Sequence, residues 1–441
     1  MLGEHRLRTV STMACIRSSR LCVRAIENLC QFGRNTQGRK KSSTAFVKIK
    51  NPGVQPLYGT SFGLHCQKEV SERLCKICSS RNKSTSSTVS DENSRYGDRR
   101  NLSTQHPGAG SMPDYQPVDP YRLTEDDLKT VHTNIRKALL MNTNQEELQR
   151  IATYYFDGQG KSFRPMVTLL MSRALNYHLN KSGVLPSQLQ MAMIAEMIHT
   201  ASLVHDDVID QSDIRRGKPS INAVWSQKKV AMAGDFILAV VSMILASLQN
   251  CDVTSTISQA ISDLVQGEFM QLGSKETENE RFAHYLTKTY RKTASLVANS
   301  LKSVAMLAGC DDQLCEIAFQ YGRNIGLAFQ LVDDLLDFIS STDTMGKPTA
   351  TDLKLGLATA PVLFACEKYP ELNPMIMRRF QEPGDVEKAF ELVHKSQGLE
   401  QTQFLAKKHS IEAVKLANSI ASSPYQKALI IVPDMVIKRM K

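Results

Sequence analysis

Two copies of one acidic motif, each inside an apolar segment, constrain the fold of this chain more than any other feature. They are Asp206-Asp207-Val208-Ile209-Asp210 and Asp333-Asp334-Leu335-Leu336-Asp337. On an α-helix the first and fifth positions of such a pentad share one face, and the second lies about a quarter turn away. Buried carboxylates are costly unless they are compensated, and hard divalent cations compensate them well. The predicted metal ligands are Asp206, Asp207, Asp210, Asp333, Asp334 and Asp337.

Two further Asp pairs provide an internal comparison. Asp126-Asp127 and Asp311-Asp312 lack a third Asp four residues after the first, and their flanks are polar enough to face solvent. Acidic residues are favoured in the first turn of a helix because they complement its dipole. We therefore expect these two pairs to mark solvated helix starts.

Apolar residues recur at three- and four-residue spacing from residue 123 onward, with few strand signals. This periodicity predicts an all-α protein built as a single large helical bundle. The expected helical segments are 189–204, 230–248, 256–272, 281–307, 314–340 and 355–367. Gly217-Lys218-Pro219 and Gly346-Lys347-Pro348 predict loops, each offering a lysine shortly after an acidic motif.

The net charge of +10 belongs to the N-terminal segment. Residues 1–100 hold 19 Lys and Arg against 7 Asp and Glu, whereas the remaining residues hold 35 against 37. This distribution argues against a nucleic-acid partner for the folded part. Residues 1–78 have the basic, acid-poor composition of a mitochondrial transit peptide and presequence, with a merely disordered basic tail as the alternative. Residues 79–120 predict a flexible linker, and 121–441 the folded domain.

The cysteines predict no disulfide framework. Six of the ten precede residue 80, and the other four are scattered without paired spacing, which suits a reducing compartment. Cys75 and Cys78, with His65-Cys66 upstream, could in principle bind zinc, but few hydrophobic residues surround them. The longest apolar stretch, 236–248, is too short to span a bilayer, so a soluble or peripheral protein is predicted.

Basic and polar residues accompany the acidic motifs. Mg²⁺ takes few protein oxygens and completes its octahedron with phosphate oxygens, so a diphosphate ligand is implied. Lys161 and Arg164 precede Pro165 at a predicted helix N-terminus, which is an anion site. His199 lies two helical turns before Asp206 on the same face, as a ligand-binding or a core histidine. The weaker candidates are Arg215, Arg216, Lys292, Thr293 and Lys347, and Trp225 is predicted to pack in the core.

This ordered set resembles the trans-isoprenyl diphosphate synthase family from about residue 121 to the C-terminus. The flanking Gly267-Glu268-Phe269 and the segment 352–356 resemble most closely the catalytic subunit of animal decaprenyl or solanesyl diphosphate synthases. The resemblance implies a helical bundle of the isoprenoid synthase type with a central substrate cavity. It implies Mg²⁺ as cofactor, isopentenyl diphosphate as one substrate, and an allylic farnesyl or geranylgeranyl diphosphate as the other.

The resemblance also implies roles for individual residues. The allylic diphosphate would be held through Mg²⁺ on the acidic motifs, with Arg215, Lys292 and Lys347 sharing its charge. Thr293 and Gln330 would face the allylic cation that forms when diphosphate leaves. Isopentenyl diphosphate would be held by Lys161, Arg164, His199 and Arg216. In the family, bulky aromatics four or five residues before the first Asp stop chain growth, whereas this chain has Ala201 and Ser202 there, so a long product is expected.

The resulting hypothesis is a polyprenyl diphosphate synthase of the mitochondrial matrix that supplies the ubiquinone side chain. It would be a homodimer or a heteromer with a second prenyl synthase subunit, with no transmembrane segment, or peripheral to the inner mitochondrial membrane. Two alternatives remain. A non-catalytic partner subunit would be expected to have eroded acidic motifs, and a class I terpene cyclase would lack residues corresponding to Lys161, Arg164 and His199.

Overall fold

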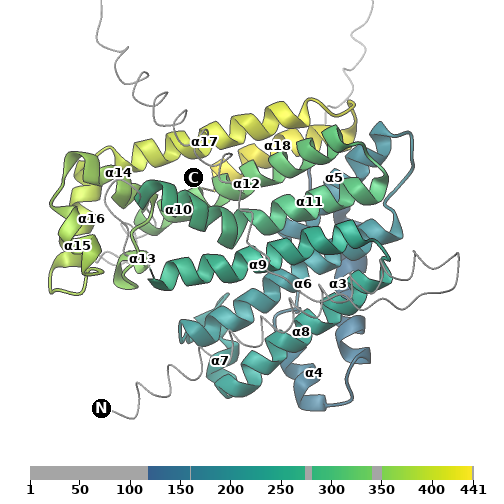
Figure 1. Ribbon diagram of the computed structural model, residues 1–441, viewed down its shortest axis with the longest axis horizontal. Coiled ribbons are helices and arrows are strands. Elements are labelled where there is room, and N and C mark those ends of the chain that lie inside the picture. Colours follow the sequence, from purple (N-terminus) through teal and green to yellow (C-terminus); the bar gives the residue numbers. More distant parts are fainter. Residues whose placement is uncertain (1–117, 159, 274–280, 340–349, 440–441) are drawn as a thin grey trace, which may run out of the picture. The chain divides into compact units, whose positions relative to one another are not determined.

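The computed structural model describes residues 118–158, 160–273, 281–339 and 350–439, and Figure 1 shows that these residues are mainly helical. The predicted presequence, the linker up to residue 117 and the possible zinc ligands lie outside the described residues. The loop that contains Lys347 also lies outside them. The all-α class predicted from periodicity is confirmed for the part that the structure describes.

The elements follow one another along the chain with short connections. The first half contains η1 (Arg122–Thr124), α3 (Glu125–Met141), α4 (Glu146–Thr153), α5 (Phe163–His178), α6 (Pro186–Ile209), β1 (Ile214–Arg215), β2 (Lys218–Pro219), α7 (Ile221–Val224), α8 (Gln227–Ser247) and α9 (Cys251–Gly273). The second half contains α10 (Arg281–Thr289), the π-helix η2 (Tyr290–Ala294), α11 (Ser295–Ala308), α12 (Asp312–Ile339), α13 (Thr351–Lys354), α14 (Ala360–Lys368), α15 (Leu372–Met377), α16 (Asp385–Lys395), α17 (Gly398–Ala417) and α18 (Pro424–Lys438).

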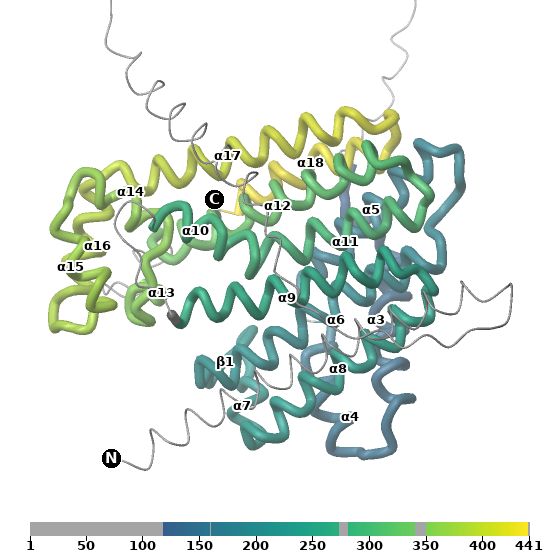
Figure 2. Tube along the Cα trace, viewed as in Figure 1, coloured from purple at the N-terminus to yellow at the C-terminus, as the bar shows by residue number. Residues whose placement is uncertain are grey.

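The long helices pack around α6, α11 and α12. Helix α12 lies against α11 on one side and α17 on another, and α6 contacts α5, α8 and α11. Figures 1 and 2 show α17, α12, α11 and α9 side by side, with α6 and α8 beyond them. The largest fully buried side chains include Tyr321 and Phe338 of α12. The two helices that carry the acidic motifs are therefore held by burial on several faces.

Small residues let α12 and α9 approach the π-helix. A Cβ added at Gly326 of α12 would lie 2.5 Å from Cα of Ala294, and one at Gly267 of α9 would lie 2.9 Å from the backbone nitrogen of Lys292. Both distances are shorter than real contacts between such atoms, so any larger side chain would push the helices apart. This close packing brings η2 against the helix that carries the second acidic motif.

The structure departs from two of the sequence predictions. The predicted helix 355–367 is wrong at its start: α13 ends at Lys354, Gly356 has a φ of +77°, and α14 begins only at Ala360. The predicted loop at Gly217-Lys218-Pro219 contains strand β2, paired antiparallel to β1 across Arg216 and Gly217, both with positive φ. This two-residue turn matches the twist of a hairpin, which explains why so short a sheet forms.

The apolar stretch predicted as 236–248 belongs to a longer helix. Helix α8 has 21 residues, and by length and composition alone it could cross a membrane, the one such helix among the described residues. Of its most apolar window, 44% is buried inside the protein. The segment is therefore a bundle helix that packs on α6 and α4 and leaves one face exposed.

The smaller predictions are mostly confirmed. Asp126 and Asp127 lie in the first turn of α3, but only Asp126 is solvated, because Asp127 pairs with Arg173 of α5 at 2.6 Å. Asp311 precedes α12 and accepts the backbone N–H of Leu314 at 2.8 Å. Trp225 is half-buried and packs edge-on against Tyr154, with ring centroids 5.2 Å apart.

Candidate active site

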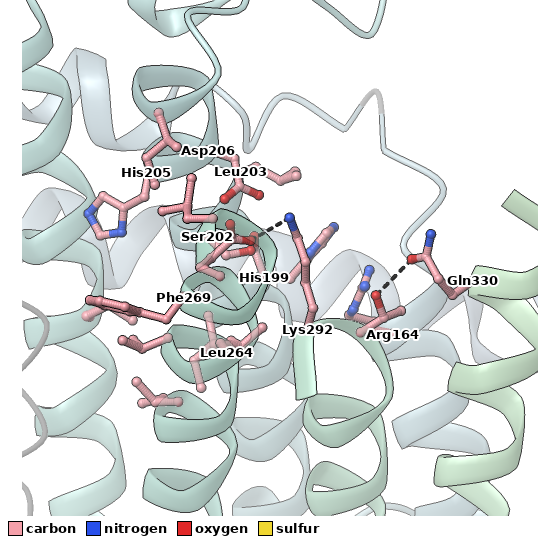
Figure 3. Close-up of a pocket in the computed structure, with 18 of the residues that line it drawn as sticks. Arg164, His199, Ser202, Leu203, His205, Asp206, Leu264, Phe269, Lys292 and Gln330 are labelled. Atoms are coloured by element: carbon pink, nitrogen blue, oxygen red, sulfur yellow. Dashed lines mark hydrogen bonds and ion pairs between the residues drawn. The ribbon is translucent and has the colours of Figure 1, made fainter. Parts of the chain in front are cut away.

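One elongated cavity of about 360 Å³ lies between α6, α9, η2 and α12. One part of its wall is polar and carries residues from both acidic helices, and the rest is apolar. In Figure 3, Leu264 and Phe269 lie below the polar group formed by Asp206, His199 and Lys292. The polar lining consists of Arg164, His199, Ser202, His205, Asp206, Glu268, Lys292, Thr293, Gln330 and Asp333. The apolar lining includes Ile198, Leu203, Ile209, Leu238, Ile261, Leu264, Val265, Phe269, Leu272 and Phe329.

The first acidic motif lies in the last turn of α6. Asp206 faces the cavity, where burial, together with the charge of Glu268, raises its pKa to about 7. Asp207 is fully buried and accepts hydrogen bonds from the hydroxyl of Tyr155 and, at 2.5 Å, from Nε of Arg215. Asp210 is exposed as the C-cap residue of the helix. The structure thus brings Arg215 to the first motif, as predicted.

The second motif lies near the end of α12. Asp333 lines the cavity and accepts a 2.8 Å hydrogen bond from Arg439, just after α18. Asp334 is buried and accepts from the hydroxyl of Tyr285 and from Gln330 at 3.0 Å. Burial raises the pKa of both carboxyls, although Arg439 opposes this for Asp333.

Asp337 does not face the cavity in the way the motif predicted. Its two oxygens accept the backbone N–H groups of Thr351 at 2.9 Å and Asp352 at 3.0 Å. These are unpaired donors of the first turn of α13, for which a carboxylate is a favourable partner. The oxygens of Asp337 therefore anchor α13, and its role as a direct metal ligand stays a prediction.

The π-helix places the predicted polar residues together. Lys292 forms an ion pair with Glu268 at 2.5 Å and a hydrogen bond to Gln271 at 3.2 Å. Burial lowers the pKa of Lys292, but the charges of Glu268 and Asp206 leave it above its usual value. Thr293 donates to the side-chain oxygen of Gln330 at 2.8 Å, and Gln330 in turn donates to Asp334. Single π-turns of this kind are frequent at functional sites.

The predicted anion site forms at the N-terminus of α5. Arg164 lines the cavity, and its Nε is buried with no hydrogen-bond partner. A Cβ at Gly160 would lie 2.8 Å from Nη1 of Arg216, so this glycine lets the hairpin arginine reach the same loop. Lys161 is exposed beside them. Burial lowers the pKa of Arg164, the carboxylates of Glu196 and Asp333 oppose this, and Arg216 lowers the pKa further.

His199 is half-buried in the cavity wall, so the ligand-facing interpretation fits its position better than the core interpretation. Burial lowers its pKa well below the usual value, and the positive charges of Arg164 and Arg216 lower it further. The imidazole is therefore neutral at physiological pH. A neutral imidazole can donate one hydrogen bond to an anion without changing the charge of the site.

Only one of the two predicted chain-length residues lines the cavity. Ser202 lines the cavity, whereas Ala201 is fully buried and is not part of its lining. Both are small, and the apolar wall continues past them to Leu264 and Phe269. A larger side chain at Ser202 would enter the cavity directly, while one at Ala201 would first have to displace packed neighbours.

Sequence analysis gave no role to several residues of the site. Tyr155 and Tyr285 each hold one buried carboxylate, and Arg439 reaches Asp333 from the far end of the chain. Glu268 and Asp352 add acidic charge near the motifs, and burial with the charge of Asp334 raises the pKa of Asp352 to about 7. Isolated tyrosines and a C-terminal arginine belong to no sequence motif and no regular spacing. Their contacts with the acidic motifs are therefore seen only in the structure.

The site fits divalent cations bound together with a phosphate ligand. Among the described residues, no three His, Cys, Asp or Glu side chains are grouped as a complete metal cage. Mg²⁺, however, is usually held by one or two carboxylates while phosphate oxygens and water fill its other positions. Asp206 and Asp333 line one cavity from two helices, and burial raises the pKa of both carboxyls despite the nearby charges of Lys292 and Arg439. A cation between them would compensate the charge of the two carboxylates.

Comparison with known proteins identifies the family. The polyprenyl synthetase family model matches residues 145–393, and the chain belongs to this family. It is 55% identical over 326 residues to human all trans-polyprenyl-diphosphate synthase PDSS1, covering 74% of this chain and 78% of the human protein. It is 43% identical over 345 residues to decaprenyl-diphosphate synthase subunit 1 of Schizosaccharomyces pombe, covering 72% of this chain and 91% of that protein.

Solved structures agree with the fold. The crystal structure of a polyprenyl synthase from Caulobacter crescentus, complexed with calcium and isoprenyl diphosphate, matches with a TM-score of 0.65 at 30% identity, over 73% of this chain and 97% of that one. A decaprenyl diphosphate synthase from Rhodobacter capsulatus matches with the same TM-score at 29% identity, over 73% and 98%. The resemblance stated from the motifs is thereby confirmed.

Proposed function

We propose that the protein is a Mg²⁺-dependent, long-chain all-trans-polyprenyl diphosphate synthase that adds isopentenyl diphosphate units to an allylic diphosphate. The observation that carries this proposal is a single cavity with carboxylates of both motifs and Arg164 in its polar part, and an apolar wall beyond. A diphosphate with an isoprenoid tail has the same two-part chemistry. The relatives named above, all of them synthases, support the assignment and favour neither alternative.

The chain's own side chains account for the binding of two anionic substrates. Bound Mg²⁺ would neutralise the allylic diphosphate and stabilise it as it leaves. Asp206, Asp207, Asp210, Asp333 and Asp334 are the proposed carboxylates around it, with Arg215, Lys292 and Lys347 sharing the charge. Arg164, Arg216 and Lys161 would hold isopentenyl diphosphate, with neutral His199 as a hydrogen-bond donor. The side-chain oxygens of Thr293 and Gln330 lie in the cavity wall, where they would stabilise an allylic cation.

The bond changes balance without any further reagent. The allylic carbon–oxygen bond breaks and releases diphosphate, and the double bond of isopentenyl diphosphate attacks the resulting cation. One proton of the former isopentenyl unit then passes to the released diphosphate, and an alkene is restored. The test is incubation of residues 118–441 with labelled isopentenyl diphosphate and either farnesyl or geranylgeranyl diphosphate, followed by product sizing. Absence of a long-chain product both alone and with a candidate partner subunit would overturn the proposal.

Product length can be tested at the cavity wall. We expect Ser202→Phe to shorten the major product by several isoprene units, because its ring would enter the cavity below Asp206. Ala201→Tyr should shorten the product less than Ser202→Phe and should also destabilise the protein. The reason is that Ala201 is fully buried and its larger side chain would first displace packed neighbours. Chromatography of dephosphorylated products measures the length, and Ser202→Thr is the matched control. Unchanged product length in both large variants would contradict this account of chain termination.

The mitochondrial matrix is the proposed location, and the ubiquinone side chain is the proposed use of the product. Two supports are the basic, acid-poor composition of residues 1–78 and the description of the rice solanesyl-diphosphate synthase 1 relative as mitochondrial. That relative is 40% identical over 342 residues. Import of residues 1–78 fused to a reporter into isolated mitochondria is the test, and a reporter left outside would count against the location.

A second copy of the chain is the proposed partner at α8. The exposed face of this helix carries Met232 and Met243, which are 66% and 49% exposed, with Ala239 and Ala246 between and beyond them. This spacing forms one apolar stripe, and such stripes are commonly covered in oligomers. We expect Met232→Glu with Met243→Glu to shift the protein from dimer to monomer in light scattering. Met377→Glu, at an exposed methionine on another helix, is the control. A wild-type monomer would refute the homodimer.

A further inference from the structure

A second cavity, of about 80 Å³, lies apart from the proposed active site. It is formed where α9 ends, near α10, α13 and α15, the end of the bundle at which Figure 1 places these helices together. Arg281, His284, Tyr285 and Lys288 of α10 line one side, and Gly356 and Arg379 line the other. None of the proposed substrate-binding residues lines this cavity.

The cavity gathers basic side chains, and its two arginines have neutral hydrogen-bond partners among the described residues. Arg281 donates to the side-chain oxygen of Asn373 at 2.7 Å, and Arg379 donates to the backbone oxygen of Leu272 at 2.8 Å. Both partners are neutral. Among the described residues, no carboxylate lies within 4.0 Å of the charged nitrogens of Arg281, Arg379 or Lys288, unlike the lysines of nearby α16, which pair with acids. Burial lowers the pKa of Lys288, although the charges of Asp334, Asp352 and Glu268 oppose this.

The backbone at Arg379, an exposed residue, has an unusual conformation. Arg379 and Phe380 are consecutive residues with φ of +56° and +53°, a conformation that side chains other than glycine rarely adopt. The turn is held by the hydrogen bond from the N–H of Phe380 to the oxygen of Met375 at 2.9 Å. A Cβ at Gly356 would lie 3.0 Å from Cβ of Arg379, so the two sides of the cavity touch at this point. Unfavourable backbone conformations persist where the surrounding structure enforces them, often at functional sites.

We propose that this second cavity binds a small inorganic phosphate anion, phosphate or diphosphate, without the help of a metal ion. Guanidinium groups whose hydrogen-bond partners are neutral are suited to phosphate oxygens, and Lys288 adds a third basic side chain to the lining. The volume admits a compact anion but no prenyl chain, which distinguishes this cavity from the first. The bound anion would lie beside Tyr285, whose hydroxyl holds Asp334 of the second motif. The proposal does not depend on the proposed function, because it concerns binding of an inorganic anion only.

Isothermal titration calorimetry with inorganic phosphate and with diphosphate, in the presence of a metal chelator, tests the proposal on the folded chain. We expect the wild-type protein to bind at least one of the two anions and the double variant Arg281→Gln, Arg379→Gln to bind it at least tenfold more weakly. Arg379→Lys should keep most of the affinity, because it retains the charge. Lys388→Gln, which removes an exposed cation of α16, should leave this binding unchanged.

Two outcomes would overturn the proposal. One is the absence of any metal-independent binding by the wild-type protein. The other is a double variant that binds the anion as tightly as the wild-type protein, or an Arg164→Gln variant that no longer binds it. In either case the anion would occupy the first cavity. Far-ultraviolet circular dichroism and the melting temperature establish that each variant is folded, and the single variant Arg281→Gln carries the test if the double variant is not. None of these results depends on whether the protein elongates prenyl chains.

Discussion

The two acidic motifs share one spacing but are held differently. In both, the first Asp lines the cavity and the second is buried against a tyrosine hydroxyl, Tyr155 for Asp207 and Tyr285 for Asp334. The other partners differ, because Asp207 has the charge of Arg215 at 2.5 Å whereas Asp334 has the neutral amide of Gln330 at 3.0 Å. The same pentad therefore produces one ion-paired carboxylate and one that depends on neutral donors.

The third Asp shows the larger contrast. Asp210 is an exposed C-cap residue at the end of α6, whereas both oxygens of Asp337 accept backbone N–H groups of α13. One motif leaves its last carboxylate available to a ligand, and the other uses it to fix the chain that follows. The repeated motif therefore determines which carboxylates lie near one another, and the neighbouring helices determine what each carboxylate can bind.

The largest expected effect comes from the first Asp of either motif. Asp206→Asn keeps the shape of the side chain but removes a charge from the cavity, so we expect turnover to fall by about 100-fold or more, a loss of roughly 3 kcal/mol in transition-state stabilisation. Asp333→Asn should have an effect of the same order, because it lines the same cavity. Steady-state rates at saturating Mg²⁺ measure this, with the exposed Asp126→Asn as control. Near-normal turnover of both variants would break the proposed equivalence of the motifs.

Much of the fold could be predicted from sequence because apolar periodicity reports directly on burial. The segment 314–340 was predicted within two residues of α12, and 281–307 spans α10, η2 and α11. Prediction failed at Gly356, where one residue with positive φ interrupts an otherwise helical pattern. The π-turn at η2 has no signal in the sequence pattern, although Gly267 and Gly326 of other helices lie close to it.

The sequence predicts which residues belong to the candidate site, but it does not predict which of them contact one another. Lys292, Thr293 and Gln330 were chosen from sequence, and they do line the cavity. Nothing in the spacing of Asp337 distinguishes it from Asp210, because its partners lie 14 and 15 residues further along the chain. Arg439 lies 106 residues from Asp333, and its contact depends on how α18 packs. Long-range pairings of single polar residues leave no periodic signal.

Metal affinity should depend on pH through the first motif. Burial raises the pKa of Asp206 from 3.8 to about 7. The folded protein is therefore less stable when this carboxyl is ionised than when it is protonated. The stability that the protonated form provides is present below about pH 4 and is lost as pH rises through about 7. A divalent cation must displace that proton below pH 7, so we expect Mg²⁺ to bind roughly tenfold more tightly at pH 8 than at pH 6. Calorimetric titration measures this difference.

The control for this pH effect is the charge-neutral variant Asp206→Asn, which should weaken Mg²⁺ binding at pH 8 and reduce the difference between the two pH values. The difference should not vanish, because burial with the charge of Asp334 also raises the pKa of Asp352 to about 7. Equal Mg²⁺ affinity of the wild-type protein at pH 6 and pH 8 would show that Asp206 does not bind the metal as a carboxylate.

The smallest expected effect separates the third positions of the two motifs. Asp337→Asn should reduce the free energy of unfolding by about 1 kcal/mol without Mg²⁺, because an amide accepts the N–H groups of Thr351 and Asp352 less well than a carboxylate. Asp210→Asn should leave the metal-free stability nearly unchanged, since its side chain is exposed, and should instead raise the Mg²⁺ concentration needed for half-maximal activity. Denaturant unfolding in chelator and a Mg²⁺ titration of the rate measure the two effects. If Asp337→Asn changed only the Mg²⁺ requirement, and Asp210→Asn only the stability, the assignment of one carboxylate to the ligand and the other to α13 would have to be reversed.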